Sequence, residues 1–211
     1  MNWAWIAGNI GTIVDATIDH IVLTVIAVGV GFLISLAFSL LIHRDRRWNG
    51  PVTGFAGVLY TIPSLALFAI LVPFTGLTLV TAEIGLISYT LLILTRNITA
   101  GLDGVPRDIN EAADGMGYTS RARLRGVELP LAVPLIIAGL RIATVTTIGL
   151  VMVTALIGEG GLGQLMLRGF NLGNDTAVYV GAIMSVVLAI VADAALLGAG
   201  RLAMPWARAR S

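Results

Sequence analysis

Cysteine and lysine are both absent from the sequence, and all thirteen basic residues are arginine. Without cysteine the chain forms neither a disulfide nor a thiolate metal site. Without lysine it lacks the residue of a P-loop that reaches nucleotide phosphates, and it lacks the amine that Schiff-base catalysis requires. These absences exclude P-loop nucleotide hydrolysis and imine chemistry within this polypeptide.

Charge of either sign is also scarce, since 12% of the residues are charged and 57% are hydrophobic. The mean hydropathy is +0.93. Soluble domains carry about 25% charged residues, so this composition is typical of a membrane protein. The net charge of +1 does not indicate a nucleic-acid partner, and the expected surroundings are a lipid bilayer.

Five apolar segments are long enough to cross a bilayer, which takes about 20 residues for roughly 30 Å of hydrocarbon. They are residues 21–42, 52–73, 77–94, 131–157 and 176–200. The first two carry no charge, and the others carry Glu83, Arg141 and Asp193 in turn. A single membrane domain over residues 1–211, with a polar insertion at about 95–130, is therefore predicted, and its class is all-α.

Arginine placement predicts the orientation of these spans. The arginines after the first, third and fifth spans fall on one side of a five-span protein, and only Arg168 falls on the other. They are Arg44, Arg46 and Arg47, then Arg96, Arg107, Arg121, Arg123 and Arg125, then Arg201, Arg208 and Arg210. Because cytoplasmic loops carry an excess of basic residues, we expect the N-terminus outside and the C-terminus in the cytoplasm.

The polar insertion is predicted to form a helix, a turn and a second helix. Pro106 suits a first helical turn, and Gly115 and Gly117 suit a helix end. Thr119 or Ser120 can cap the second helix. Pro130 is expected to mark the bend into the fourth span, and Arg121, Arg123 and Arg125 are expected to form a basic face.

The order of residues in this insertion follows a longer pattern. E-A-A is followed by three residues, Gly, nine residues, an aliphatic residue, one residue and Leu-Pro. The matching residues are Glu111, Ala112, Ala113, Gly117, Val127, Leu129 and Pro130. This pattern resembles the EAA loop of the membrane subunits of bacterial ABC importers. An ordinary structured loop, whose arginines bind lipid headgroups, is the alternative.

The resemblance implies a type I ABC importer permease-like bundle of five transmembrane helices in the bacterial plasma membrane. It implies a cytoplasmic coupling helix that docks on a separate ATPase subunit, present in two copies. The chain itself would then bind no cofactor and no metal, while ATP and Mg belong to the partner. It also implies a second permease subunit, identical or related, and an extracytoplasmic solute-binding protein.

Two further stretches narrow the resemblance. Residues 60–73, YTIPSLALFAILVP, and residues 138–165, AGLRIATVTTIGLVMVTALIGEGGLGQL, resemble permeases of the osmoprotectant branch. Members of that branch import glycine betaine, choline, carnitine or proline betaine. The resemblance runs from about residue 19 to residue 200, and Glu83 departs from it, since an apolar residue is expected there. The alternative is a permease for methionine or another small amino acid.

Two other function classes lack support in the sequence. An intramembrane hydrolase would carry a G-x-S-x-G-like elbow or an H-E-x-x-H motif, and neither is present. A transporter working alone would not need a coupling segment, and no inverted repeat is visible. The chain is therefore expected to be a transport subunit without enzymatic activity of its own.

The second span is predicted to be interrupted near its middle. Pro63 cannot donate to the helical hydrogen-bond ladder, and Thr61 and Ser64 are placed to bond the freed groups. Substrate-lining and moving helices use such breaks, although a packing kink explains Pro63 equally well. Aromatic residues in these spans are candidate pathway contacts: Tyr60, Phe68 and Tyr89.

Ionisable residues inside the spans need partners, because a charge at the helix centre costs at least about 2.5 kcal/mol. Arg141 and Asp193 lie at similar depth and are expected to pair, within one chain or across a dimer, as a structural lock. Glu83 is expected to reach headgroups or a water-filled vestibule. His20 and His43 are expected at the two interfaces of the first span.

The glycine-rich stretch GEGGLG, residues 158–163, is not followed by lysine, so a phosphate cradle is rejected. It is predicted to form a tight external turn or a re-entrant piece that closes the pathway.

Overall fold

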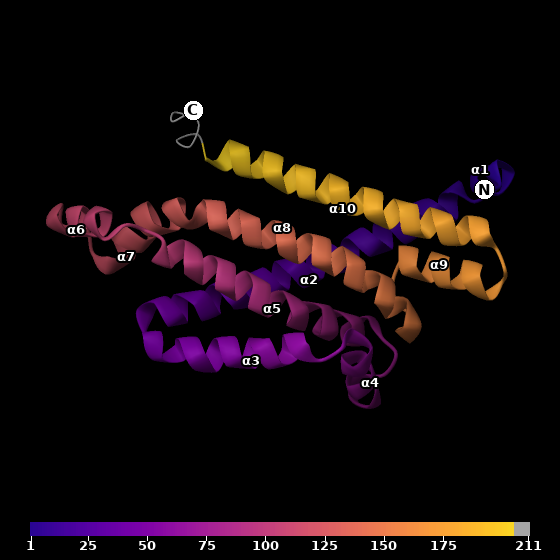
Figure 1. Cartoon of the computed structure of the whole chain (residues 1–211), viewed down its shortest axis with the longest axis horizontal. Coiled ribbons are helices and arrows are strands. Elements are labelled where there is room, and N and C mark those ends of the chain that lie inside the picture. Colours follow the sequence, from indigo (N-terminus) through magenta and orange to yellow (C-terminus); the bar gives the residue numbers. More distant parts are fainter. Residues whose placement is uncertain (205–211) are drawn as a thin grey trace.

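The computed structural model describes residues 1–204; Arg208 and Arg210 lie outside the described residues. Over this range the chain folds into helices joined by short turns, without any strand (Figure 1). The prediction of an all-α membrane protein is confirmed.

The helices follow one another closely along the chain. Their bounds are α1 Trp3–Gly8, α2 Ile10–Arg44, η1 Arg46–Trp48, α3 Asn49–Thr61, α4 Ser64–Thr75, α5 Leu79–Asp103, α6 Arg107–Gly115, α7 Ser120–Arg123, the π-helical turn η2 Leu124–Glu128, α8 Leu129–Thr154, η3 Ala155–Ile157, α9 Leu162–Asn171 and α10 Asp175–Ala203.

Within the described residues, four helical stretches are long and apolar enough to cross a membrane by themselves. They are α2, α5, the continuous stretch from α7 through η3, and α10. The predicted second span is a bent pair, since α3 and α4 meet at 97°. The count reaches five only if this pair is one span.

The long helices extend beyond the apolar segments that the sequence marks. Helix α2 begins at Ile10 rather than near residue 21, and α5 continues to Asp103 rather than ending near residue 94. Asp103 forms an ion pair with Arg46 at 2.6 Å, which joins the end of α5 to the turn after α2. The length of an apolar segment reflects the thickness of the hydrocarbon core of the bilayer. A helix can extend beyond that segment, because its backbone hydrogen bonds do not depend on apolar side chains. The polar insertion is therefore shorter than predicted and begins near residue 104.

Helices α2, α5 and α8 pack against one another along the bundle (Figure 1). At one end Leu23, Phe68, Leu86 and Val151 belong to one apolar cluster. Small residues allow close approach, because a Cβ at Gly139 would lie 2.5 Å from the Cβ of Asn97. Membrane helices associate largely through such tight packing.

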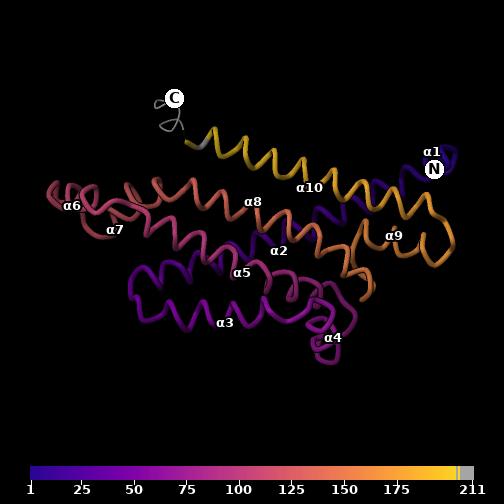
Figure 2. The backbone as a smooth tube through the Cα atoms, viewed as in Figure 1, coloured from indigo at the N-terminus to yellow at the C-terminus, as the bar shows by residue number. Residues whose placement is uncertain are grey.

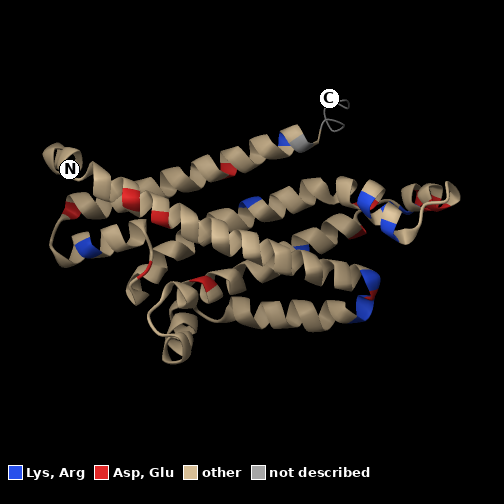
Figure 3. Ribbon diagram, turned by 180° about the vertical axis from the view of Figure 1, so that it is seen from behind, with Lys and Arg blue, Asp and Glu red and all other residues tan. Residues whose placement is uncertain are grey.

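The two ends of the bundle differ in charge. Arginines gather where α6, α7 and the turn after α2 lie, and acidic residues predominate at the end that carries the N-terminus (Figure 3). Helix α10 begins beside α1 and runs the length of the bundle toward the arginine-rich end (Figure 2). This separation is the charge asymmetry that arginine placement in the sequence predicts.

Candidate functional site

The insertion between α5 and α8 forms a helical hairpin that projects from the arginine-rich end (Figure 1). Its first helix, α6, ends at Gly115, and Gly117 in the following turn has φ of 84°. A side chain with a Cβ is strained in that conformation, whereas glycine is not. The Thr119 side chain accepts a hydrogen bond from the N–H of Ala122 at 3.3 Å. Thr119 is therefore the cap of α7, one of the two predicted candidates.

Pro130 does not break the chain into two separate helices, which is what the predicted bend implied. Helix α7, the π turn η2 and α8 are continuous, and Pro130 lies in the first turn of α8. The N–H of Leu129 donates to the carbonyl of Leu124, the wider spacing of a π turn. Because Pro130 has no N–H, α-helical bonding is interrupted here, and the π turn accommodates the interruption within one continuous helical stretch.

A buried carboxylate joins this hairpin to the first long helix. Glu128 is 2% exposed. Its Oε1 accepts a hydrogen bond from Nε of Arg123 at 2.9 Å, and its Oε2 lies 2.9 Å from Nε2 of His43. Arg123 also forms an ion pair with Asp114. Four side chains thus connect α6, α7, the start of α8 and the end of α2.

This network was not anticipated from the sequence. Arg123 was expected on a basic face with Arg121 and Arg125; those two are exposed, but Arg123 turns toward Glu128. The reason is that a buried carboxylate requires a charged or hydrogen-bonding partner. One feature of the sequence could have indicated a buried carboxylate: the acidic Glu128 stands between two aliphatic residues of the motif.

The motif residues divide between the outside and the inside of the hairpin. Glu111, Ala112 and Gly117 are exposed, and Ala113 is buried. Val127, Leu129 and Pro130 are half-buried at the base of α8. Large apolar side chains are exposed beside the outer residues: Ile109, Met116 and Tyr118. The hairpin therefore offers a mixed apolar and acidic surface on a fixed backbone.

The second unusual region is the break between α3 and α4 at Ile62 and Pro63. The Tyr89 hydroxyl donates a hydrogen bond to the carbonyl of Ile62. The rings of Tyr60 and Tyr89 meet edge to face, with centroids 6.0 Å apart. Tyr89 thus bonds one of the carbonyls that the break leaves without a helical partner.

The other residues predicted around the break have different surroundings. The Thr61 hydroxyl donates to Val58 within α3 at 2.8 Å, and Ser64 is half-buried as the first residue of α4. Phe68 is 1% exposed, and a Cβ at Gly85 would lie 2.3 Å from its ring. Phe68 is therefore a core residue in this conformation and does not face a pathway, because α4 folds back onto α5.

The intramembrane charges lie on two other helices. Nε and one terminal nitrogen of Arg141 donate to the two carboxylate oxygens of Asp193, each at 2.7 Å. The pair joins α8 to α10 within one chain, one of the two arrangements that the sequence left open. It lies in a groove of about 730 Å³ between these helices, lined otherwise mainly by apolar residues. The side chains are about one-third exposed, at 33% and 36%.

Two ionisable residues occupy unexpected places. Glu83 is 8% exposed rather than at a headgroup, and no hydrogen bond from the described residues reaches its carboxylate. His20 is fully buried, and its Nε2 lies 3.1 Å from the carbonyl of Ile148 in α8. His20 is therefore a contact between helices rather than an interfacial residue. The rotation of each helix about its axis decides whether these side chains are buried, and their position in the sequence does not reveal that rotation.

The glycine-rich stretch forms a tight turn before α9, the first of the two predicted forms. Gly158, Gly160 and Gly161 have φ of 88°, 137° and 47°. A Cβ at Gly161 would lie 2.5 Å from the carbonyl oxygen of Ala16, so the turn rests directly on α2. Among the described residues, no group of three His, Asp or Glu side chains could hold a metal ion.

Solved structures share this fold. The chain resembles a structure of the MetNI methionine ABC transporter in an inward-facing conformation, with a TM-score of 0.81 over 93% of this chain and 98% of that chain at 22% identity. It also resembles an amino acid ABC transporter solved with histidines, with a TM-score of 0.74 over 97% and 98% of the two chains at 18% identity.

Sequence relatives cover nearly the same length. The chain is 38% identical to the osmoprotectant import permease protein OsmW of Salmonella typhimurium, over 88% of each. It is 36% identical to the choline transport system permease protein OpuBB of Bacillus subtilis, over 93% of this chain and 91% of the relative. It is 35% identical to the glycine betaine/carnitine/choline transport system permease protein OpuCB of Bacillus subtilis, over 88% and 85%.

Residues 27–197 match the family described as binding-protein-dependent transport system inner membrane component. This range includes the hairpin, the broken helix pair and both members of the Arg141–Asp193 pair. With its helical spans, the chain is a multi-pass membrane protein and a transport subunit rather than an enzyme. It belongs to the binding-protein-dependent transport system inner membrane component family.

Proposed function

We propose that this chain is the permease subunit of an ATP-driven importer for osmoprotectants of the quaternary-amine class, such as glycine betaine, choline, carnitine or proline betaine. The observation that carries the proposal is the set of relatives at 35–38% identity over most of the chain, whose names specify osmoprotectants, choline, glycine betaine and carnitine. The likeness to amino acid transporters lies at 18–22% identity and supports the fold alone.

We propose that the hairpin of each permease in a pair docks one ATPase subunit, so that the complex contains two ATPase subunits. The exposed hairpin residues Glu111, Ala112 and Gly117, beside Met116 and Tyr118, form a surface that a groove on a partner can enclose. The partner supplies ATP and Mg, since this chain lacks the lysine of a P-loop. The network around Glu128 would transmit movement of the docked hairpin to α2 and α8.

We place the arginine-rich end, with the hairpin, in the cytoplasm of a bacterial cell. Arg46, Arg47, Arg121 and Arg125 lie there, and basic residues are enriched on the cytoplasmic side of membrane proteins. The N-terminus and the turn at residues 158–161 then lie outside. An extracytoplasmic solute-binding protein would deliver the solute at that outer end.

A second permease, identical or related, completes the proposed pathway. A single chain with a broken second span leaves large apolar residues exposed along α3, α4 and α10, among them Phe55, Phe74 and Ile190. The path would pass the break, where Tyr60 and Thr61 are exposed and Pro63, Ser64 and Tyr89 shape the bend. Closure of the ATPases would rock the two permeases between inward- and outward-facing states.

The test is uptake of labelled glycine betaine into liposomes that contain the whole complex, with ATP on the hairpin side. Unlabelled choline and carnitine should compete with the label, and methionine should not. Entry of an amino acid while betaine stays outside would reject the substrate class and leave the permease assignment intact. ATP-independent uptake by the permease alone would reject the coupled mechanism.

A further inference from the structure

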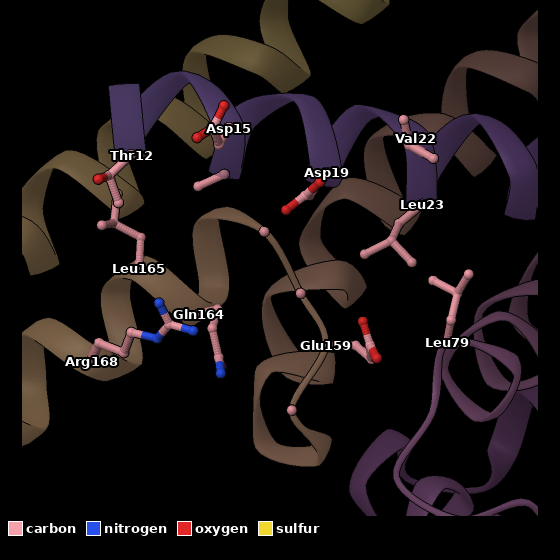
Figure 4. A pocket seen from close by; sticks show the side chains of 14 residues that line it. Thr12, Asp15, Asp19, Val22, Leu23, Leu79, Glu159, Gln164, Leu165 and Arg168 are labelled. Atoms are coloured by element: carbon pink, nitrogen blue, oxygen red, sulfur yellow. The ribbon is translucent and has the colours of Figure 1, made fainter. Parts of the chain in front are cut away.

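A cavity of about 570 Å³, seen from close by in Figure 4, lies where the first half of α2 meets α9, at the end of the bundle opposite the hairpin (Figure 1). Its walls come from the first half of α2, the turn at residues 158–161, the start of α9 and Leu79 at the start of α5. This volume is within the range of small-molecule sites, about 300–1,000 Å³. None of the residues proposed above for the pathway lines it.

Carboxylates from two separate segments surround the cavity. Asp15 and Asp19 are four residues apart on α2 and share one helix face, and Glu159 comes from the glycine turn. In Figure 4, Asp19 and Glu159 point into the space between α2 and the turn. Arg168 on α9 is the one basic residue of the lining. No hydrogen bond or ion pair within the described chain engages the three carboxylates, so the cavity is negative.

The walls that carry these charges are held in place by the backbone. Cβ atoms at Gly161 would lie 2.5 Å from the carbonyl oxygen of Ala16 and 2.6 Å from the backbone nitrogen of His20. The turn that presents Glu159 is therefore fixed against the same part of α2 that presents Asp15 and Asp19. Because backbone contacts fix the relative positions of these segments, the ordering cost of binding is lowered.

The chemistry of the lining favours an organic cation. The carboxylates are spread around the cavity, and no three acidic or histidine side chains in the described chain are close enough to hold a metal ion. Apolar side chains also line the cavity: Val22, Leu23, Leu79 and Leu165. A cation with methyl groups contacts both kinds of surface, whereas a hydrated inorganic ion would leave the apolar walls unused.

Two buried polar groups near the cavity lack partners. Oε1 of Gln164, which lines the cavity, is buried without a hydrogen bond from the described residues. Glu83 is one helical turn deeper along α5 than Leu79, on the same face, and both its carboxylate oxygens are buried and unbonded. Buried polar atoms are normally paired, so Gln164 Oε1 is an acceptor in the cavity wall that remains free to bond a ligand's hydroxyl.

We propose that this cavity binds the quaternary ammonium group of the solute on the permease itself, with Asp15, Asp19 and Glu159 facing the positive charge. The inference rests on the proposed function, because the relatives' solutes supply the cation. Under this proposal the permease itself selects cationic solutes, before the solute reaches the break between α3 and α4.

Binding of radiolabelled choline to the assembled permease–ATPase complex in nanodiscs, without ATP and without the solute-binding protein, tests the site directly. Wild type should bind choline saturably, and Asp19→Asn combined with Glu159→Gln should weaken binding at least about tenfold. Asp175→Asn, an exposed change at the same end outside the cavity lining, should bind as wild type does. Asp19→Glu keeps the negative charge and should retain choline binding. This control separates loss of charge from a general effect of substitution at this position.

The neutral choline isostere 3,3-dimethyl-1-butanol, in which carbon replaces the quaternary nitrogen, tests whether the positive charge of choline is needed for binding. It should not displace choline; displacement at equal concentration would overturn the proposal, as would equal choline binding by wild type and the double variant. Uptake of betaine by the full importer with no choline binding to the permease would reject this site and preserve the proposed function. Loss of uptake in the double variant with choline binding unchanged would assign the carboxylates to contact with the binding protein and overturn the solute site.

Discussion

Nε2 of His43, at the end of α2, lies 2.9 Å from Oε2 of Glu128, inside the motif of the hairpin. The first long helix and the hairpin are thereby joined through one buried carboxylate. Movement of the hairpin can reach α2 through this contact as well as through the continuous α7–α8 helix.

Replacing Glu128 by alanine should destabilise the protein and uncouple ATP hydrolysis from solute transport. Arg123 would keep Asp114 but lose its hydrogen bond to Glu128, and the contact between Glu128 and His43 would also be lost. Losing a hydrogen bond between charged groups costs about 2 kcal/mol. We expect a lower Tm in detergent and ATP hydrolysis that solute no longer stimulates. Arg121→Gln, an exposed change in the same helix, should alter neither; if it matched Glu128→Ala, the network would have no special role.

Gly117→Leu should abolish transport while the protein still inserts in the membrane. The φ of 84° strains any residue with a Cβ, and the added side chain would cover the exposed hairpin surface. Glu111→Lys should have the same effect through charge reversal. Uptake and co-purification of the ATPase are the measurements. Gly115→Ala, at a helical glycine with open space around its Cβ, is the matched control and should remain active.

Arg141→Gln and Asp193→Asn should each reduce the yield of folded protein, because each leaves one charge without its bidentate partner. The double variant should recover much of the loss, since no charge remains at that depth. Fluorescence-detected size-exclusion chromatography of the four proteins measures this. Additive losses would show that the two side chains act independently.

Tyr89→Phe should loosen the break between α3 and α4 by removing the donor to the Ile62 carbonyl. A lost hydrogen bond of this kind costs about 1 kcal/mol. The expected result is a lower Tm together with a changed maximal uptake rate. Tyr179→Phe, at an exposed tyrosine of α10, serves as the control. An unchanged Tm and rate for Tyr89→Phe would mean that the hydroxyl does not hold the bend.

Glu83→Gln should raise thermal stability, by about 1 kcal/mol or more, because an unpaired buried carboxylate is costlier than an amide. If Glu83 also serves solute passage, the same variant should import choline more slowly. A Tm equal to or below that of wild type would indicate that Glu83 has a partner in the assembled complex. Ser88→Ala, at the next turn of α5, controls for a general change in the helix.

The hairpin was predictable in outline because its determinants are local. A positive φ at Gly117, a capping hydroxyl at Thr119 and a helix end at Gly115 depend on residues a few positions apart. The effect of Pro130 was not predictable in the same way, because the π turn that accommodates it depends on how α8 continues and packs.

The sequence by itself determined the membrane class, the charge asymmetry of the two ends and the helical hairpin. Hydropathy and turn chemistry are read over short windows, and the bilayer imposes a fixed length on apolar runs. Only the tertiary structure decided that Phe68 and His20 are buried, that Arg123 turns toward Glu128, and that Asp19 and Glu159 face one cavity. These pairings depend on the rotation and axial offset of packed helices, which side-chain fit sets between residues far apart in the chain.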